Sequence, residues 1–80
     1  MTTILYVFDK TDGRKIKYSL PDITEPVLSA LCDLIRTTAA ATCLDVILNA
    51  SNIAFTSEYV DNVNYVLDKD HLYAIEVNND

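Results

Sequence analysis

His71 and the carboxylates beside it are the residues of this 80-residue chain whose types could support catalysis. A histidine near carboxylates, here Asp68 and Asp70, can act as a general base. The same two aspartates, or Asp9 with Asp12, could also offer oxygen ligands to calcium, but a calcium loop needs a denser run of them. No serine or cysteine is spaced to suggest a catalytic triad. We therefore expect a strand-end histidine and carboxylates in turns, with no catalytic, cofactor-binding or metal site.

The two cysteines, Cys32 and Cys43, do not form a redox or zinc motif. They lack the CxxC spacing of a redox pair, and a zinc site needs about four ligands, which two scattered cysteines and one histidine do not supply. Free cysteines outside such motifs usually behave as small apolar side chains. We expect two buried thiols.

The clearest candidate binding group is a set of basic residues around the only glycine, Gly13. Residues 1–20 hold four basic and two acidic residues, whereas residues 21–80 hold two basic and ten acidic residues. Lysines along one strand can discourage edge-to-edge pairing, or they can bind an acidic protein or the acidic surface of a second copy. We name the set the basic cluster; its members are Lys10, Arg14, Lys15 and Lys17.

The overall charge disfavours several classes of partner. The net charge of −6 disfavours nucleic acid and anionic membranes, because both need clustered cations. No run of about 18 apolar residues is present to cross a bilayer, and the first residues do not resemble a secretory signal. We expect a cytoplasmic chain with a protein partner, with homo-oligomerisation as an open possibility.

The pair Asp12-Gly13 predicts a β-hairpin near the start of the chain. The residues before it, Thr3 to Phe8, are apolar on both faces, which is typical of an inner strand. The residues after it, Arg14 to Leu20, alternate between apolar and polar side chains, and their lysines favour an edge strand.

A helix is predicted after the hairpin. Thr24 suits its N-cap, since this places Pro26 at the second helical position, where a missing N–H costs nothing. Apolar residues then recur at helical spacing as far as Thr38. Residues 39–42 could extend the helix or link it to the next element.

The second half of the chain reads mainly as strands. Leu44 to Leu48 predicts a third strand, Ile53 to Phe55 a short fourth one, and His71 to Val77 an inner last strand. Residues 56–67 leave two alternatives open: a short helical turn that starts at Thr56, or a turn followed by a strand from Val63 to Leu67.

This order of elements resembles the ubiquitin-like β-grasp superfamily over nearly the whole chain. The Asp12-Gly13 hairpin, the helix that follows it, and the strand and turn pattern after residue 44 carry the resemblance. It implies a single α+β domain over residues 1–80, with one main helix packed on a mixed sheet of four to five strands. It also implies that the first and last strands lie parallel in the centre of the sheet.

The resemblance also bears on function. Conjugated members of that superfamily end in a glycine pair, whereas this sequence ends Val77-Asn78-Asn79-Asp80. We therefore expect no covalent tagging or sulfur transfer, and favour a non-enzymatic protein-interaction module that binds through an exposed sheet face or the basic cluster, with some of the five tyrosines as anchors. Two alternatives stay open: a small acidic inhibitor of the phage or toxin-system type that acts by charge mimicry, and an enzyme that uses His71 with a carboxylate.

Overall fold

The computed structural model, which describes residues 2–38 and 41–78, opens with the predicted hairpin. Strand β1 (Thr2–Asp9) pairs antiparallel with β2 (Arg14–Leu20), and residues 10–13 connect them. Gly13 adopts a φ of 74°, a left-handed conformation that favours glycine, and its N–H donates to the Asp9 carbonyl oxygen at 2.8 Å. The hairpin prediction is therefore confirmed, with a four-residue loop.

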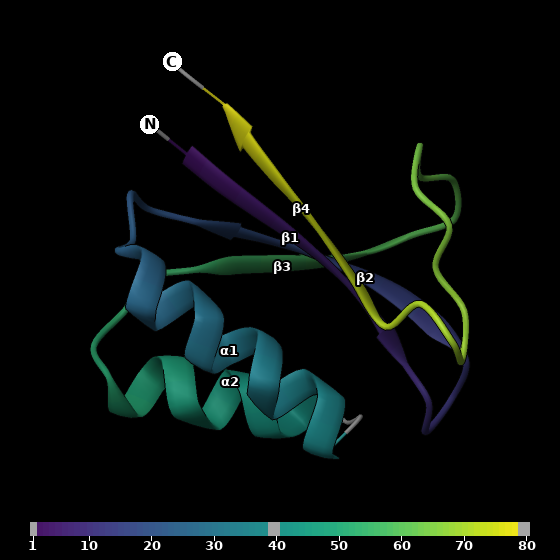
Figure 1. Cartoon of the computed structure of the whole chain (residues 1–80), viewed down its shortest axis with the longest axis horizontal. Coiled ribbons are helices and arrows are strands. Elements are labelled where there is room, and N and C mark those ends of the chain that lie inside the picture. The colour runs from purple at the N-terminus through teal and green to yellow at the C-terminus, as the bar shows by residue number, and fades with distance from the viewer. Residues whose placement is uncertain (1, 39–40, 79–80) are drawn as a thin grey trace.

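The described strands form one antiparallel sheet with two helices on one of its faces (Figure 1). The chain is thus a small α+β domain. The sheet order is β3-β2-β1-β4, and every neighbouring pair is antiparallel. The remaining elements are α1 (Glu25–Thr38), α2 (Ala41–Ala50), β3 (Thr56–Val60) and β4 (Tyr73–Asn78).

The topology corrects part of the expected arrangement. β1 is an inner strand, as predicted, but β2 is not an edge strand because β3 pairs with its outer side. The last strand, β4, was expected to be inner and lies at the edge. It runs antiparallel to β1, so the expected mixed sheet with parallel central strands is wrong, and the β-grasp arrangement is not confirmed.

The helical layer contains two helices rather than one main helix. α1 begins after Thr24, as predicted, and extends to Thr38. The predicted strand from Leu44 to Leu48 is wrong, because these residues belong to α2. Leu44 and Leu48 are buried while Val46 and Ile47 are exposed, which is the period of a helix. A short apolar run does not reveal its period unless its exposed positions are polar. Of residues 39–42, for which a helix extension and a linker were both open, Ala41 and Thr42 begin α2, and residues 39 and 40 lie outside the described residues.

The segment after α2 also differs from the expectations. Ile53 to Phe55 forms no strand, although both of these side chains pack against the core. Neither alternative for residues 56–67 is correct: β3 covers Thr56–Val60, and residues 61–72 form a loop that contains only an isolated bridge between Asp68 and His71. The β-branched and aromatic residues of β3 gain a partner strand in β2, which a local pattern cannot reveal.

The main core lies between the sheet and the helices. Alternate residues of β1 and β2 face the helices, because residues opposite each other in the register share a face. Nine buried side chains form this core: Leu5, Val7, Ile16, Tyr18, Leu20, Leu31, Ile35, Leu44 and Leu48.

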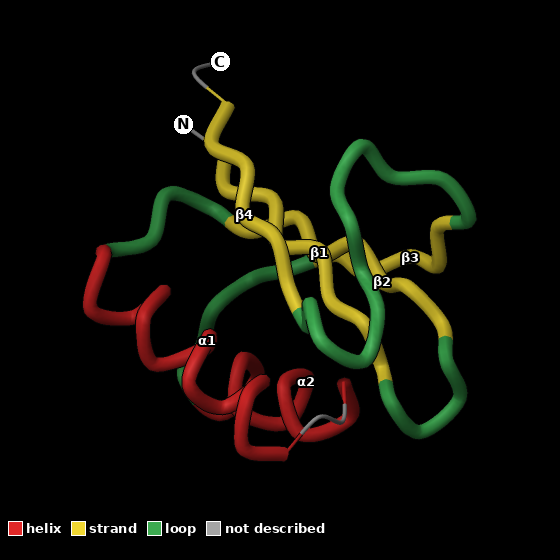
Figure 2. Tube along the Cα trace, turned by 45° about the vertical axis from the view of Figure 1, so that its right-hand side comes forward, coloured by secondary structure: helices red, strands yellow, loops and turns green. Residues whose placement is uncertain are grey.

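The loop of residues 61–72, which we call the strap, crosses the sheet on the side away from the helices (Figure 2). Its Tyr65 ring packs against the Tyr6 ring, with 5.5 Å between centroids, and the Tyr65 hydroxyl donates to Glu76 Oε2 at 3.0 Å. Leu67 of the strap and Ile4 of β1 are both buried. The strap therefore covers the second apolar face of β1.

One buried polar contact joins the two layers. The side chain of Tyr18 is almost fully buried, and its hydroxyl donates to Asp45 Oδ1 on α2 at 2.9 Å. Burial, together with this hydrogen bond to a carboxylate, raises the pKa of Tyr18 well above its usual range.

We expect Tyr18→Phe to lower the free energy of unfolding by about 1.5–3 kcal/mol at neutral pH, because it removes a hydrogen bond to a charged group. A tyrosine whose pKa is raised on folding contributes its full stabilisation below its ordinary pKa of about 10, and this contribution is lost as the pH rises further. The difference in free energy of unfolding between wild type and Tyr18→Phe should therefore become smaller above about pH 10. Urea denaturation from pH 7 to 11 measures this; Tyr65→Phe is the exposed control, and an equal loss in both variants would contradict it.

Candidate functional site

The structure divides the basic cluster between the two faces of the sheet. Arg14 shares a face with the buried residues Ile16 and Tyr18, whereas Lys15 and Lys17 lie on the opposite face. Lys10 is exposed in the hairpin loop. The four residues therefore lie around one end of the sheet but do not form one continuous patch.

Nearby carboxylates offset the positive charge of two of the four basic residues. Asp12 Oδ2 lies 3.9 Å from Arg14 Nε, and Glu58 Oε1 lies 3.9 Å from Lys17 Nζ. In the described part of the chain, Lys10 and Lys15 form no salt bridge. Since β2 is not an edge strand, its lysines do not protect an open edge.

The end of the sheet that carries the hairpin also carries Tyr59, one of the five tyrosines that the sequence offers as interface anchors. Tyr59 of β3 is 62% exposed, and the Arg14 guanidinium lies over its ring, with Cζ 4.8 Å from the ring centroid. The register brings them together because Tyr59 lies opposite Ile16, next to Arg14 on the same face. Tyr59 and Val60 are residue types that favour strands, so the sequence could suggest a strand here. It could not show that Arg14 lies over Tyr59, because that contact depends on the pairing of β3 with β2.

An open hollow of about 450 Å³ lies beside this pair. Gly13 lines the hollow with its backbone, and the space where a Cβ would stand is empty, with no heavy atom within 4 Å. We call this hollow and its lining the hairpin site; its residues are Gly13, Arg14, Lys15, Tyr59, Val60 and Asp61.

His71 and Asp68 form a closed turn in the strap. Their main chains exchange two hydrogen bonds of 3.1 Å, and Asp68 Oδ1 accepts from the N–H groups of Asp70 and His71 and lies 3.1 Å from His71 Nδ1. The hydrogen bonds, first of all that from Asp70 N–H, lower the pKa of Asp68. The carboxylate is occupied by its own turn, and its side chain and that of His71 are largely exposed.

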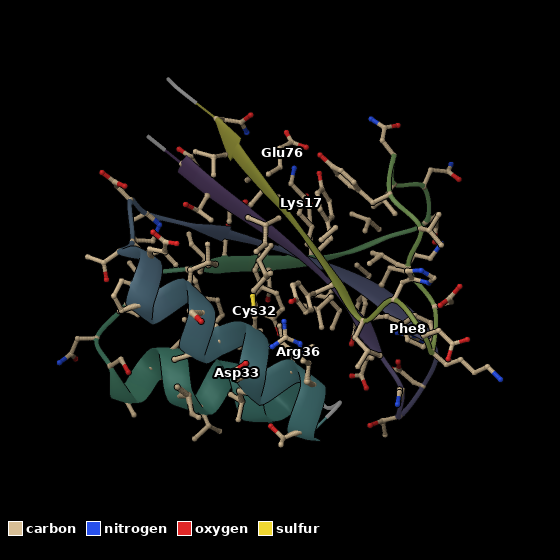
Figure 3. The ribbon with its side chains drawn as sticks, viewed as in Figure 1. Phe8, Lys17, Cys32, Asp33, Arg36 and Glu76 are labelled. Carbon is tan, nitrogen blue, oxygen red and sulfur yellow. The ribbon has the colours of Figure 1, made fainter. Side chains whose placement is uncertain are left out.

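Cys32 lies on α1, close to Arg36 (Figure 3). It is free and buried, as expected, and burial raises the pKa of its thiol despite a hydrogen bond from Tyr73. Arg36 stacks on the Tyr73 ring at 5.3 Å and pairs with Asp33, so it joins α1 to β4. The thiol is shielded and weakly acidic, which does not suit a nucleophile. The side chain of Cys43 lies outside the described ones.

Other observations add no second site. Among residues 2–38 and 41–78, no group of three or more histidine, cysteine or acidic side chains could hold a metal ion. No helix in those ranges is long and apolar enough to cross a membrane. Comparisons with protein-family models, with curated proteins and with solved structures found no match.

We expect Asp68→Ala to lower the melting temperature at neutral pH, because the Asp70 N–H loses its acceptor and the His71 N–H keeps only the Asp68 carbonyl oxygen. A carboxyl whose pKa is lowered on folding stabilises the fold above its ordinary pKa, about 4, and stops doing so as the pH falls further. Thermal melts from pH 7 to 2 should thus show the deficit of the variant shrinking below about pH 4. Asp70→Ala, which removes a neighbouring carboxylate, should melt like wild type, and a deficit that persists at pH 2 would contradict the assignment.

Proposed function

We propose that this chain is a non-enzymatic protein-interaction module that binds an acidic segment of a partner protein at the hairpin site. The observation that carries the proposal is the Arg14 guanidinium held over the exposed ring of Tyr59 at the border of an open hollow. Tyrosine and arginine dominate the energetics of protein interfaces, since both combine apolar area with polar groups.

The geometry supports binding without a large rearrangement. The stacked ring holds the guanidinium in place, so less side-chain entropy is lost on binding than for a free arginine. The guanidinium can still bind a carboxylate, because its contact with Asp12 is long, at 3.9 Å, and exposed. Lys15 lines the same hollow and has no salt bridge among the described residues. A partner carboxylate would therefore meet the Arg14 guanidinium, and an apolar side chain next to that carboxylate in the partner would pack on the Tyr59 ring.

Electrostatic attraction contributes only part of the affinity that we propose for an acidic partner. Asp12, Glu58 and Asp61 lie among the basic residues, so the site is not strongly positive. Added salt should weaken binding only moderately, as expected where aromatic contacts contribute most of the affinity. The alternative inhibitor, which would act through the acidic surface, requires a basic partner and a steep salt dependence. Neither role depends on a relationship to the ubiquitin-like superfamily.

The test uses a fluorescein-labelled peptide rich in glutamate and leucine, with a lysine and leucine peptide as the charge control. We expect the wild-type chain to bind the acidic peptide, and Arg14→Ala and Tyr59→Ala each to weaken binding about tenfold or more, the effect of losing an interface anchor. Fluorescence anisotropy at low and high salt measures the affinities.

Arg36→Ala is the matched control, because it also removes an arginine that stacks on a tyrosine, but on α1 rather than at the hairpin site. It should leave peptide binding unchanged. Equal losses for Arg14→Ala and Arg36→Ala would contradict the proposal, as would no binding of the acidic peptide. Binding of the basic peptide that survives Arg14→Ala and collapses with salt would favour the inhibitor instead.

A further inference from the structure

β4 forms an open border of the sheet, at the edge opposite β3 (Figure 1). Its sequence, Tyr73–Asn78, is rich in residues that favour strands. It contains no lysine or proline, and its register with β1 is continuous, so it has no bulge. Natural proteins usually protect an open edge by one of these devices.

The backbone groups that point outward from β4 can be identified from one hydrogen bond. Phe8 N–H donates to the Leu72 carbonyl oxygen at 2.8 Å, so these two residues form a hydrogen-bonded pair with β1. Hydrogen-bonded and non-hydrogen-bonded pairs alternate along an antiparallel ladder. The N–H and C=O groups of Tyr73, Ile75 and Val77 must therefore point away from β1, and within residues 2–38 and 41–78 no strand pairs with them.

We infer that β4 pairs antiparallel with β4 of a second copy of this chain, about a two-fold axis at Ile75, to form one continuous sheet. In this register Ile75 faces its own copy, and Tyr73 faces Val77. The backbone N–H and C=O groups of these three residues point away from β1. Each of the three facing pairs would therefore exchange two hydrogen bonds, about six in all. Val77, which is 53% exposed in the single chain, would lie against an aromatic ring.

Charge favours this register and this edge over their alternatives. On the opposite face of the sheet, Ala74 would lie opposite Glu76 of the second copy, so no like charges meet. Moving the axis by one residue to Glu76 would place Glu76 opposite itself, and like charges directly opposite are destabilising. Moving it to Ala74 would place Val77 opposite His71, which lies outside the strand. The other open edge, β3, has the same problem when two copies of this strand overlap fully, because Glu58 is its middle residue and would then face its own copy.

Sedimentation equilibrium over a range of concentrations tests the pairing in the full chain. We expect a concentration-dependent dimer for wild type. Val77→Pro should abolish dimerisation, because it removes an outward N–H without breaking the ladder with β1. Val77→Thr keeps that N–H and should dimerise. Ser57→Pro is the matched control, since the same alternation turns the Ser57 N–H to the open edge of β3; it too should dimerise.

A cross-link tests the register even if Val77→Pro destabilises the fold. Ile75→Cys should form a disulfide between two copies under mild oxidation, since facing residues lie about 5.5 Å apart between Cα atoms. Ala74→Cys should not, because its copies would lie about 8 Å apart. Mass spectrometry identifies the linked peptides. A wild-type monomer at all concentrations would overturn the inference, as would open-ended assembly abolished by Ser57→Pro, or a disulfide at residue 74 rather than 75.

Discussion

Both faces of β1 must be covered, because neighbouring residues of this strand, Ile4 and Leu5, are both buried. Leu5 packs in the core beneath the helices, whereas Ile4 lies on the face that the strap crosses. A strand that is apolar on both faces also needs neighbours on both sides, and β1 has β2 and β4. The helices, the strap and the two flanking strands can all be understood as the covers that this one strand requires.

The sequence predicts those elements whose signal is local. The positive φ of Gly13 and the cap of α1 at Thr24 both follow from residue types at particular positions, and both predictions are confirmed. The sequence does not predict α2, because the exposed positions Val46 and Ile47 are apolar and hide the helical period. Nor does it predict the pairing of β3 with β2 or the direction of β4, because strand pairing depends on residues distant in the sequence.

The same limit applies to the hairpin site. The sequence identifies Arg14 and Lys15 by charge, but not the carboxylate of Glu58 that offsets Lys17, nor the ring of Tyr59 beneath Arg14. All of these contacts reach the cluster through β3. The sequence predicts a charged patch, whereas the structure has an arginine stacked on a tyrosine beside a hollow. The proposed function therefore depends more on these anchor residues than on long-range electrostatic attraction. The open edge of β4 is independent of it, so a dimer would present two hairpin sites.

The antiparallel placement of β4 against β1 is the central claim, since it defines the edge of the sheet and the face that the strap covers. Nuclear Overhauser spectroscopy tests it most directly, because the non-hydrogen-bonded pairs of an antiparallel ladder bring facing Hα atoms close together. The register predicts strong Hα–Hα contacts between Thr3 and Val77, Leu5 and Ile75, and Val7 and Tyr73. Contacts between β1 and β4 residues that increase together along both strands would instead show a parallel pair and contradict this account.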